Sequence, residues 1–249
     1  MAKLAVLILT YNEELHIEEC MKSAAFADEI VVVDSGSTDR TVELATSGGA
    51  RAVTHPMTDG FAAQRNFALL QSDAEWIMFL DADERITPEL AAEIKSTVRA
   101  GTEAGYYIPR RNRFMGRWIK SCGWSPDLSL RLFIRNAANY TGIVHESLHI
   151  DGKVGRLKNC FEHLAYTNLE QYLQKMNNYT TLAARGLQEK GKTTCALEIA
   201  FRPVFAFIKM YILRKGFTEG LEGFIISVLS AVYVFLKYGK LYYLQRNSQ

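Results

Sequence analysis

The chain has 249 residues, enough to bury a substantial core, and its composition (48% hydrophobic, 22% charged) is ordinary for a folded protein. The net charge of +2 gives no electrostatic case for nucleic-acid binding. Four scattered cysteines without a CxxC spacing exclude a zinc ribbon or a thioredoxin motif, and nothing in them requires an oxidising compartment. The first apolar run, Leu4–Leu9, is too short for a signal peptide, so we expect a cytoplasmic location.

The first hundred residues alternate short apolar runs with amphipathic stretches. The runs are rich in Val, Ile and Leu and predict buried strands at Leu4–Leu9, Glu29–Val33, Arg51–Thr54 and Trp76–Leu80. The amphipathic stretches predict helices over Glu14–Phe26, Thr38–Ser47, Gly60–Leu70 and Pro88–Arg99. Strand–helix alternation of this kind is typical of a parallel sheet with helices on both faces.

The segment from Tyr106 to Phe161 has a different pattern, because Gly, Asn, Asp and Pro separate its apolar runs. It predicts a mixed or antiparallel extension of the same sheet, with strands at Tyr106–Ile108, Leu130–Ile134, Ile143–Ile150 and Leu157–Phe161. Asn168–Gln188 predicts a helix, and the remainder is helical. We therefore expect an α/β domain over residues 1–165 and a helical C-terminal region over residues 166–249.

The C-terminal region is basic and rich in aromatic residues. Residues 185–249 hold ten Lys or Arg and four Glu, a net charge of +6, so residues 1–184 carry −4. The longest uncharged apolar run, Phe224–Leu236, has thirteen residues and is shorter than the ~20 needed to span a bilayer. The aromatic and basic residues around Pro203–Met210 are typical of an interfacial amphipathic helix. A helical hairpin packed on its own domain, or in an oligomer interface, explains the pattern equally well.

Polar residues follow three of the four predicted parallel strands. They are Tyr11-Asn12-Glu13, the loop from Asp34 to Asp39, and Asp81-Ala82-Asp83. In an open parallel sheet, ligands bind beyond the carboxyl ends of the strands. Each group alone is explained by a turn or a helix cap, but their common position at one edge predicts a binding site.

The two aspartates of Asp81-Ala82-Asp83 stand at the end of a buried strand, where like charges repel unless a cation is present. Hard carboxylate oxygens suit Mg²⁺ or Mn²⁺, which keep positions open for phosphate oxygens. A DxD sequence is common by chance, and its place after the fourth strand of an alternating series is what makes it informative.

These motifs resemble those of family 2 glycosyltransferases of the GT-A fold. The resemblance covers residues 4–100 most strongly and includes Leu9–Glu14, Val32–Asp39, Gln64-Arg65-Asn66 and the DxD sequence. It continues through Trp124–Asp127, Arg131-Leu132-Phe133 and Val144-His145-Glu146, where the pattern is similar to the lipopolysaccharide core glucosyltransferases.

The resemblance implies a role for each matching residue. Tyr11 would stack on the uracil of a UDP-sugar, and Asp34 would accept a hydrogen bond from the base edge. Asp81 would contact the ribose or the metal, and Asp83 would hold the metal that bridges the diphosphate. The remaining residues implied near the nucleotide are Asn12, Glu13, Arg65 and Arg131.

The catalytic base is a carboxylate in this resemblance, with Glu146 first and Asp127 second. Either could instead be the structural partner of an arginine such as Arg131 or Arg135. His163 is a candidate further metal ligand, because GT-A enzymes often supply a late histidine, although a lone histidine is more often structural.

A rival motif, HExxH, spans His145 to His149 and is the signature of zinc metalloproteases when it lies on a helix. The alternation around it predicts an extended segment instead, in which the two histidines stand about 13 Å apart at ~3.3 Å per residue. That separation is too large for one zinc ion with bonds of ~2 Å. Gly155 also stands where the longer metzincin motif needs its third histidine.

The sequence thus predicts an inverting, metal-dependent glycosyltransferase. It would move a hexose, glucose by the resemblance, from a UDP-sugar to a lipopolysaccharide-core or lipid-linked saccharide. We expect it to be peripheral on the inner face of the cytoplasmic membrane, with no nucleic-acid partner, and a homo-oligomer is left open. The alternatives are a nucleotide-sugar-binding protein without turnover and the zinc metalloprotease.

Overall fold

The structure is a computed structural model that describes residues 2–58, 60–141, 147–166 and 169–247. Two compact units are present, one formed by Met1–Arg110 with Asp127–His163, the other by Arg111–Pro126 with Leu164–Gln249. Each unit is described by itself.

The parallel half of the main sheet has the strand order β3-β2-β1-β4. Its strands are β1 (Leu4–Thr10), β2 (Glu29–Asp34), β3 (Arg51–Thr54) and β4 (Trp76–Asp81). Thr10 of β1 pairs with Asp34, and Leu9 pairs with Asp81, so the carboxyl ends of β1, β2 and β4 meet at one edge. The four predicted strands are confirmed to within one residue at each end.

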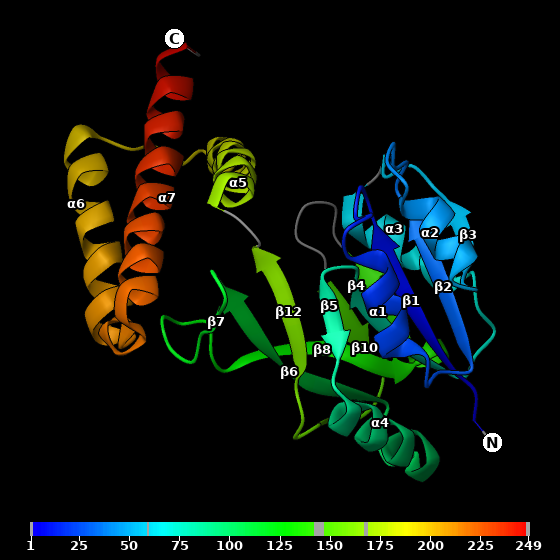
Figure 1. The fold of residues 1–249 in the computed structure, drawn as a ribbon. Coiled ribbons are helices and arrows are strands. Elements are labelled where there is room, and N and C mark those ends of the chain that lie inside the picture. Colours follow the sequence, from blue (N-terminus) through cyan, green and yellow to red (C-terminus); the bar gives the residue numbers. More distant parts are fainter. Residues whose placement is uncertain (1, 59, 142–146, 167–168, 248–249) are drawn as a thin grey trace. The chain divides into compact units, whose positions relative to one another are not determined.

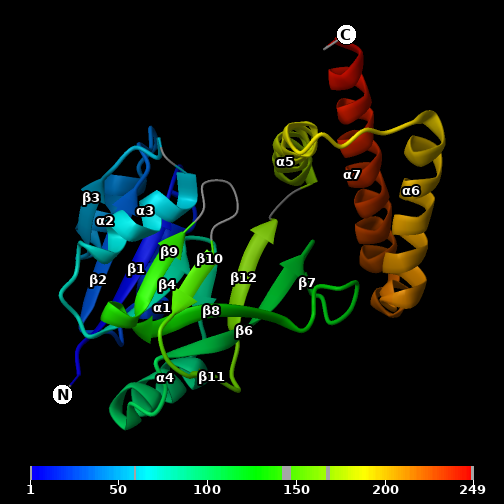
Figure 2. The same ribbon diagram turned by 180° about the vertical axis from the view of Figure 1, so that it is seen from behind.

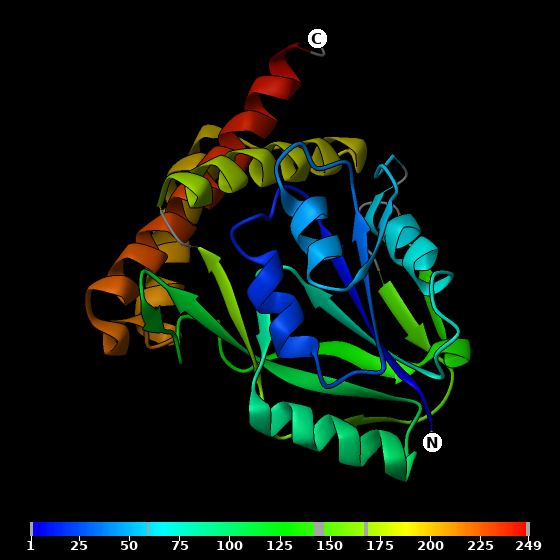
Figure 3. The same ribbon diagram turned by 45° about the vertical axis from the view of Figure 1, so that its right-hand side comes forward.

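Helices cover both faces of this sheet, as predicted. They are α1 (Ile17–Ala24), α2 (Thr41–Ser47), α3 (Gly60–Leu69) and α4 (Pro88–Ala100). The ends of α4 follow its sequence signals, because the Thr87 side chain accepts a hydrogen bond from Leu90 N–H and Gly101 adopts the left-handed conformation with φ of 59°. Figures 1 and 3 show α1 and α4 against the sheet.

The sheet continues beyond β4 with antiparallel pairing. β8 (Asp127–Ile134) lies beside β4, followed by β6 (Gly105–Phe114), β12 (Phe161–Tyr166) and β5 (Glu84–Ile86). The short strands β7 (Arg117–Trp118) and β11 (Val154–Arg156) pair with β6. A separate antiparallel pair, β9 (Ala138–Thr141) and β10 (Ser147–Ile150), follows the turn at Arg135–Ala137. The predicted mixed extension is confirmed.

The predicted strand at Leu157–Phe161 is wrong. Leu157 is buried and its N–H donates to the Tyr107 carbonyl, but the next two N–H groups donate to the carboxylate of Glu93. Because a side chain on α4 takes these donors, Lys158 and Asn159 form a turn, and the strand begins only at Phe161.

Alternate residues of β1 and β4 enter two different cores. Val6, Ile8, Met78 and Leu80 pack with α1, α2 and α4 on one face. Leu7 and Phe79 pack with α3 and with Tyr140 of β9 on the other face. Figure 2 shows β9 and β10 on the face of the sheet opposite α1. The polar ends of these strands are therefore held by a sheet that is packed on both sides.

The second unit is built on three helices, α5 (Leu169–Glu189), α6 (Ala196–Ile208) and α7 (Gly220–Asn247). α6 and α7 run side by side (Figures 1 and 2), and a π-helical turn (Lys209–Leu213) and a 3-10 turn (Gly216–Glu219) connect them. A Cβ at Gly223 would lie 1.9 Å from the Gly216 carbonyl oxygen, so the close approach of these turns requires glycine. The unit's core comprises Phe114, Ile119, Cys122, Met176, Ile226 and Leu229.

Within the described residues, one helical stretch, Gly216–Asn247, is long and apolar enough to cross a membrane, judged by length and composition alone. Core helices of soluble proteins pass the same criterion. The residues that contact this helix are therefore needed to distinguish a membrane-spanning helix from a core helix.

Candidate active site

The loops after β1 and β2 are fastened to each other. Asn12, at φ of 54°, accepts a hydrogen bond from Thr38 N–H on its side-chain oxygen, and its own N–H donates to Ser37 Oγ. The N–H of Glu13 donates to Thr41 Oγ1 at 2.8 Å. Asn12 therefore fixes the shape of the edge, a role that its predicted place near a nucleotide did not include.

Asp34 holds the turn that follows β2. Its side chain is buried and accepts hydrogen bonds from Gly36 N–H (2.9 Å), Ser37 N–H (2.8 Å) and the Ser37 hydroxyl. Gly36 has φ of 98°, which a residue with a side chain rarely adopts. The carboxylate that the resemblance places against a base edge thus also organises its own loop.

Tyr11 begins this loop and is 58% exposed, in contrast to the buried residues of β1 that precede it. A large aromatic ring open to solvent at a sheet edge offers a stacking surface. Its position is compatible with the stacking role that the resemblance implies.

Asp81 lies between two arginines. Its Oδ2 is 2.7 Å from Arg131 Nη2, and its Oδ1 is 3.6 Å from Arg65 Nη2. Burial works to raise the pKa of Asp81, but Arg131 and Arg65 outweigh it and hold that pKa below its ordinary range. Asp81 is therefore ionised and its charge is balanced by the protein itself.

Both arginines are buried, and their own surroundings explain their places. Arg65 projects from α3 with its guanidinium 4.9 Å from the centre of the Phe79 ring, so it does not lie on a solvated helix face. Arg131 projects from β8, and its Nε donates to Ser129 Oγ at 3.0 Å. Burial lowers the pKa of Arg131, but the carboxylates of Asp81 and Glu84 outweigh it and raise that pKa.

Glu84 is a member of this cluster that the sequence reasoning missed. It is fully buried, accepts from Asp81 N–H at 2.9 Å, and lies 3.1 Å from Arg131 Nη2. Burial, opposed by Arg131 and reinforced by Asp81, raises the pKa of Glu84 to about 7. The signal for it was weak: one acidic residue directly after the DxD sequence, in a segment too short to show a period.

Asp83 and His163 are brought together by the pairing of β5 with β12. The register places His163 opposite Glu84, and His163 Nε2 lies 3.5 Å from Asp83 Oδ2. Both side chains are about one-sixth exposed (16% and 15%). Across the described part of the chain, no group of three or more His, Cys, Asp or Glu side chains is arranged to hold a metal ion, and the predicted metal role of Asp81 stays a prediction.

The two candidate bases have different outcomes. Asp127 begins β8, and its Oδ2 lies 2.7 Å from Arg110 Nε, with Arg110 Nη1 also 3.6 Å from Glu84. It thus has an arginine partner, although Arg110 differs from the two arginines considered from sequence; Arg135 pairs with Asp73. Glu146 lies outside the described residues, as does His145 of the HExxH sequence. His149 lies in strand β10 opposite Asn139, which agrees with the extended segment predicted there.

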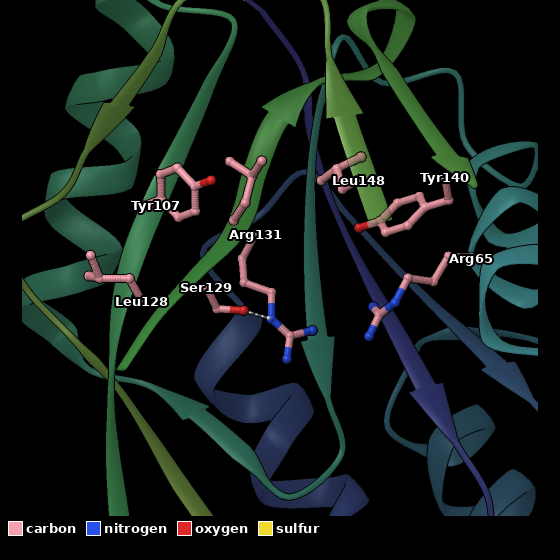
Figure 4. Close-up of a pocket in the computed structure, with 8 residues that line it drawn as sticks. Arg65, Tyr107, Leu128, Ser129, Arg131, Tyr140 and Leu148 are labelled. Carbon is pink, nitrogen blue, oxygen red and sulfur yellow. Dashed lines mark hydrogen bonds between the residues drawn. The ribbon is translucent and has the colours of Figure 1, made fainter. Parts of the chain in front are cut away.

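A cavity of about 280 Å³ opens beside the two arginines. Figure 4 shows the guanidinium groups of Arg65 and Arg131 on one side of it, with Tyr107 and Leu148 on another. The remaining lining residues are Leu128, Ser129, Leu130 and Tyr140. A mixed lining of aromatic, aliphatic and hydroxyl groups with charged donors suits a sugar, which has both apolar faces and hydroxyl edges.

Comparison with known proteins decides the family. The model for "Glycosyl transferase family 2" matches residues 5–147, more than half of the chain and the whole of the carboxyl edge. The chain belongs to glycosyl transferase family 2. It is therefore a glycosyltransferase, which excludes the metalloprotease interpretation of HExxH.

Relatives of the family cover nearly the whole chain. The lipopolysaccharide core biosynthesis glycosyltransferase LpsC of Rhizobium meliloti is 32% identical over 96% of this chain and 92% of its own length. An uncharacterized glycosyltransferase of Rickettsia typhi is 29% identical over 97% of this chain and 87% of its own length.

A solved structure supports the fold of the family. Glucosyl-3-phosphoglycerate synthase of Mycobacterium tuberculosis, in complex with phosphoglyceric acid, superposes with a TM-score of 0.50 at 16% identity, covering 77% of this chain and 81% of that one. The GT-A fold predicted from the sequence is confirmed.

Proposed function

We propose that this glycosyltransferase transfers a hexose, glucose in the first instance, from a UDP-sugar to a lipopolysaccharide-core or lipid-linked saccharide at the inner face of the cytoplasmic membrane. The acceptor class is supported by LpsC, a relative over nearly the full length whose name places it in lipopolysaccharide core biosynthesis. The donor class is supported by exposed Tyr11 at the carboxyl edge, where α/β sheets bind nucleotides.

The observation that carries the proposal is that the two aspartates of the DxD sequence have different partners. Asp81 is neutralised by Arg131 and Arg65, whereas Asp83 faces His163 across 3.5 Å. Donors bound to one Mg²⁺ or Mn²⁺ ion at ~2.1 Å lie about 3 Å apart, close to that separation. A carboxylate oxygen and an imidazole nitrogen therefore fit a divalent cation that completes its shell with diphosphate oxygens and water.

When bound, a divalent cation would offset the charge that develops on the departing diphosphate. Arg65 and Arg131 would add fixed positive charge at the same edge, already oriented by Phe79 and Ser129. The cavity of about 280 Å³ beside them would receive the hexose and exclude water from it.

We propose Glu146 as the carboxylate that accepts the proton of the acceptor hydroxyl, with inversion at the anomeric carbon following from a single displacement. Asp127 is the weaker candidate, because its carboxylate is engaged by Arg110 at 2.7 Å. Glu146→Gln should then abolish sugar transfer. Asp127→Asn should lower the stability of the protein by weakening the contact with Arg110, and should leave most of the transfer activity.

Thermal shift with a nucleotide panel tests the donor and the metal together. UDP with Mn²⁺ should raise the melting temperature, ADP and GDP should not, and Asp83→Asn should remove the UDP response. Asp73→Asn is the matched control, because that side chain is fully exposed and lies outside the carboxyl edge. Equal responses to UDP, ADP and GDP would contradict the proposed donor, and an unchanged response in Asp83→Asn would contradict the proposed metal site.

A further inference from the structure

Helix α6 carries an apolar stripe that the protein leaves uncovered. Five large apolar side chains of α6, spaced four, three, one and three residues apart, fall within about 100° of arc on an ideal helix, and a sixth follows in the π-helical turn Lys209–Leu213. They are between 40% and 68% exposed, and no residue of α6 is buried. The stripe consists of Leu197, Phe201, Val204, Phe205, Ile208 and Ile212.

The stripe is bordered at its C-terminal end by positive charge. Lys209, Arg214 and Lys215 are all exposed, and the ion pairs found among the described residues include none of the three. The two glutamates between residues 196 and 219 have other partners. Glu198 pairs with Arg202, and Glu219 is buried and accepts a hydrogen bond from Lys120 N–H at 2.8 Å.

The charges beside the stripe indicate which of two partners covers it, a second copy of the chain or a lipid bilayer. A symmetric dimer through this surface would apply the same patch to itself, and such an interface has to be self-complementary in charge. Three cations without an available acid are instead complementary to an anionic partner. Phenylalanine and leucine on one side with lysine and arginine beside them are the composition of helices that lie in a bilayer interface.

The neighbours of α7 argue against a spanning arrangement. Lys240 Nζ donates to Asn177 and to the hydroxyls of Thr180 and Thr181 at 2.7–2.8 Å, which fastens α7 to α5. α5 exposes charged residues, including Glu170 and Glu189. A membrane-spanning α7 would draw these charges into hydrocarbon, where each is costly.

We propose that the apolar stripe of α6 docks in the plane of an anionic lipid bilayer, with Lys209, Arg214 and Lys215 at its headgroups. The inference deepens the proposed function, since it names the surface that brings the enzyme to a lipid-linked acceptor. The protein is then monotopic, because α7 packs against α6 on the side away from the bilayer and does not cross the membrane.

Cosedimentation of the full chain with vesicles tests the docking surface without donor or acceptor. The wild type should bind vesicles containing about one-third phosphatidylglycerol and bind phosphatidylcholine alone far more weakly, and salt should release it. Phe201→Ser with Phe205→Ser should weaken binding at least about tenfold. Lys209→Gln with Lys215→Asn should weaken it about twenty-five-fold at low salt, from about fivefold per lysine.

Matched variants separate docking from general effects. Leu15→Ser with Leu70→Ser removes two leucines that are 77% and 78% exposed in the first unit, and should bind vesicles like the wild type. Lys153→Gln with Lys158→Gln removes two exposed lysines there and should also bind normally.

Three outcomes would overturn the proposal. One is unchanged vesicle binding by Phe201→Ser with Phe205→Ser. Another is vesicle binding that is equally strong at low and high salt, which would contradict the role of the three basic residues. The last is a wild-type protein that does not bind vesicles and sediments as a dimer, while Phe201→Ser with Phe205→Ser sediments as a monomer. Asp83→Asn should bind vesicles normally, so loss of docking and loss of sugar transfer are distinguishable.

Discussion

In the first unit, the carboxyl edge of the parallel strands takes charge out of water: Arg131 and Glu84 are buried, and Asp81 lies between two guanidinium groups. In the second unit the opposite happens, because α6 leaves Leu197, Phe201 and Phe205 in solvent. Both arrangements cost stability to the isolated protein. We propose that the edge is preorganised for a charged, metal-bound donor, and the helical face for a lipid surface outside the protein.

Removing Arg131 should have the largest effect on stability. Arg131→Met leaves Asp81 and Glu84 without their shared partner in a buried site, and we expect a loss of about 3–5 kcal/mol in the free energy of unfolding. Urea denaturation measures it. Arg135→Met is the control, since Arg135 pairs with a fully exposed Asp73 and should cost about 0–1 kcal/mol.

Adding Glu84→Gln to Arg131→Met sharpens this test. The second change removes a carboxyl group that must either bind a proton or stay charged without its partner, so the double variant should be more stable than Arg131→Met alone at a pH above about 7. If the two changes simply add, the buried charge cluster is not the source of the effect.

Asp83→Asn should lower kcat/KM for transfer from UDP-glucose by at least about a hundredfold. It removes one of the two side chains, Asp83 and His163, that are proposed to bind the metal ion. The free energy of unfolding should change little, as the side chain is partly exposed and is not the partner of Arg131. Release of UDP measures the rate, and Asp73→Asn should keep it at the wild-type level. A variant that transfers normally would remove Asp83 from the active site.

Two glycines of α7 should respond in opposite directions to the same substitution. Gly223→Ala places a methyl group 1.9 Å from the Gly216 carbonyl oxygen and should destabilise the protein by about 1–3 kcal/mol. Gly239→Ala has open space around it and should stabilise by about 0.5–1 kcal/mol through helix propensity. Thermal unfolding of both variants measures the difference, and equal effects would contradict the close packing at Gly216.

Cysteine reactivity should give the smallest and most local effect. Cys195 is exposed, whereas Cys20 and Cys122 are buried, and burial raises the pKa of both buried thiols. A thiol reagent should modify Cys195 rapidly in the native protein and reach Cys20 and Cys122 only on unfolding. Rapid modification of Cys20 in the native state would show that the core beneath Asp81 opens.

The sequence predicts well those elements whose signal is local. The strand at Arg51–Thr54 is found with its exact bounds, and the loops after β1, β2 and β4 fall on one edge as the alternation requires. The pairing of β5 with β12 is not local: seventy-odd residues separate the two strands, and only this register brings His163 to Asp83. The resemblance suggested His163; no periodicity could have placed it.

Packing explains what else the sequence does not show. Arg65 and Arg131 are two arginines among 29 basic residues, and only the aromatic rings and carboxylates around them make them part of the edge. Likewise, the sequence left α6 equally suited to a membrane interface and to a hairpin packed on its own domain or in an oligomer interface. The exposure of Phe201 and Phe205 argues against packing on its own domain, because a core helix would have buried them.

The most direct test of the central claim is manganese binding followed by electron paramagnetic resonance, because the signal of free Mn²⁺ falls when the ion is bound. With UDP present, the wild type should take up one Mn²⁺ per chain, while Asp83→Asn and His163→Gln should each bind far more weakly and Asp73→Asn should bind normally. Wild-type protein that leaves Mn²⁺ free in the presence of UDP, or variants at Asp83 and His163 that bind it as the wild type does, would contradict the account.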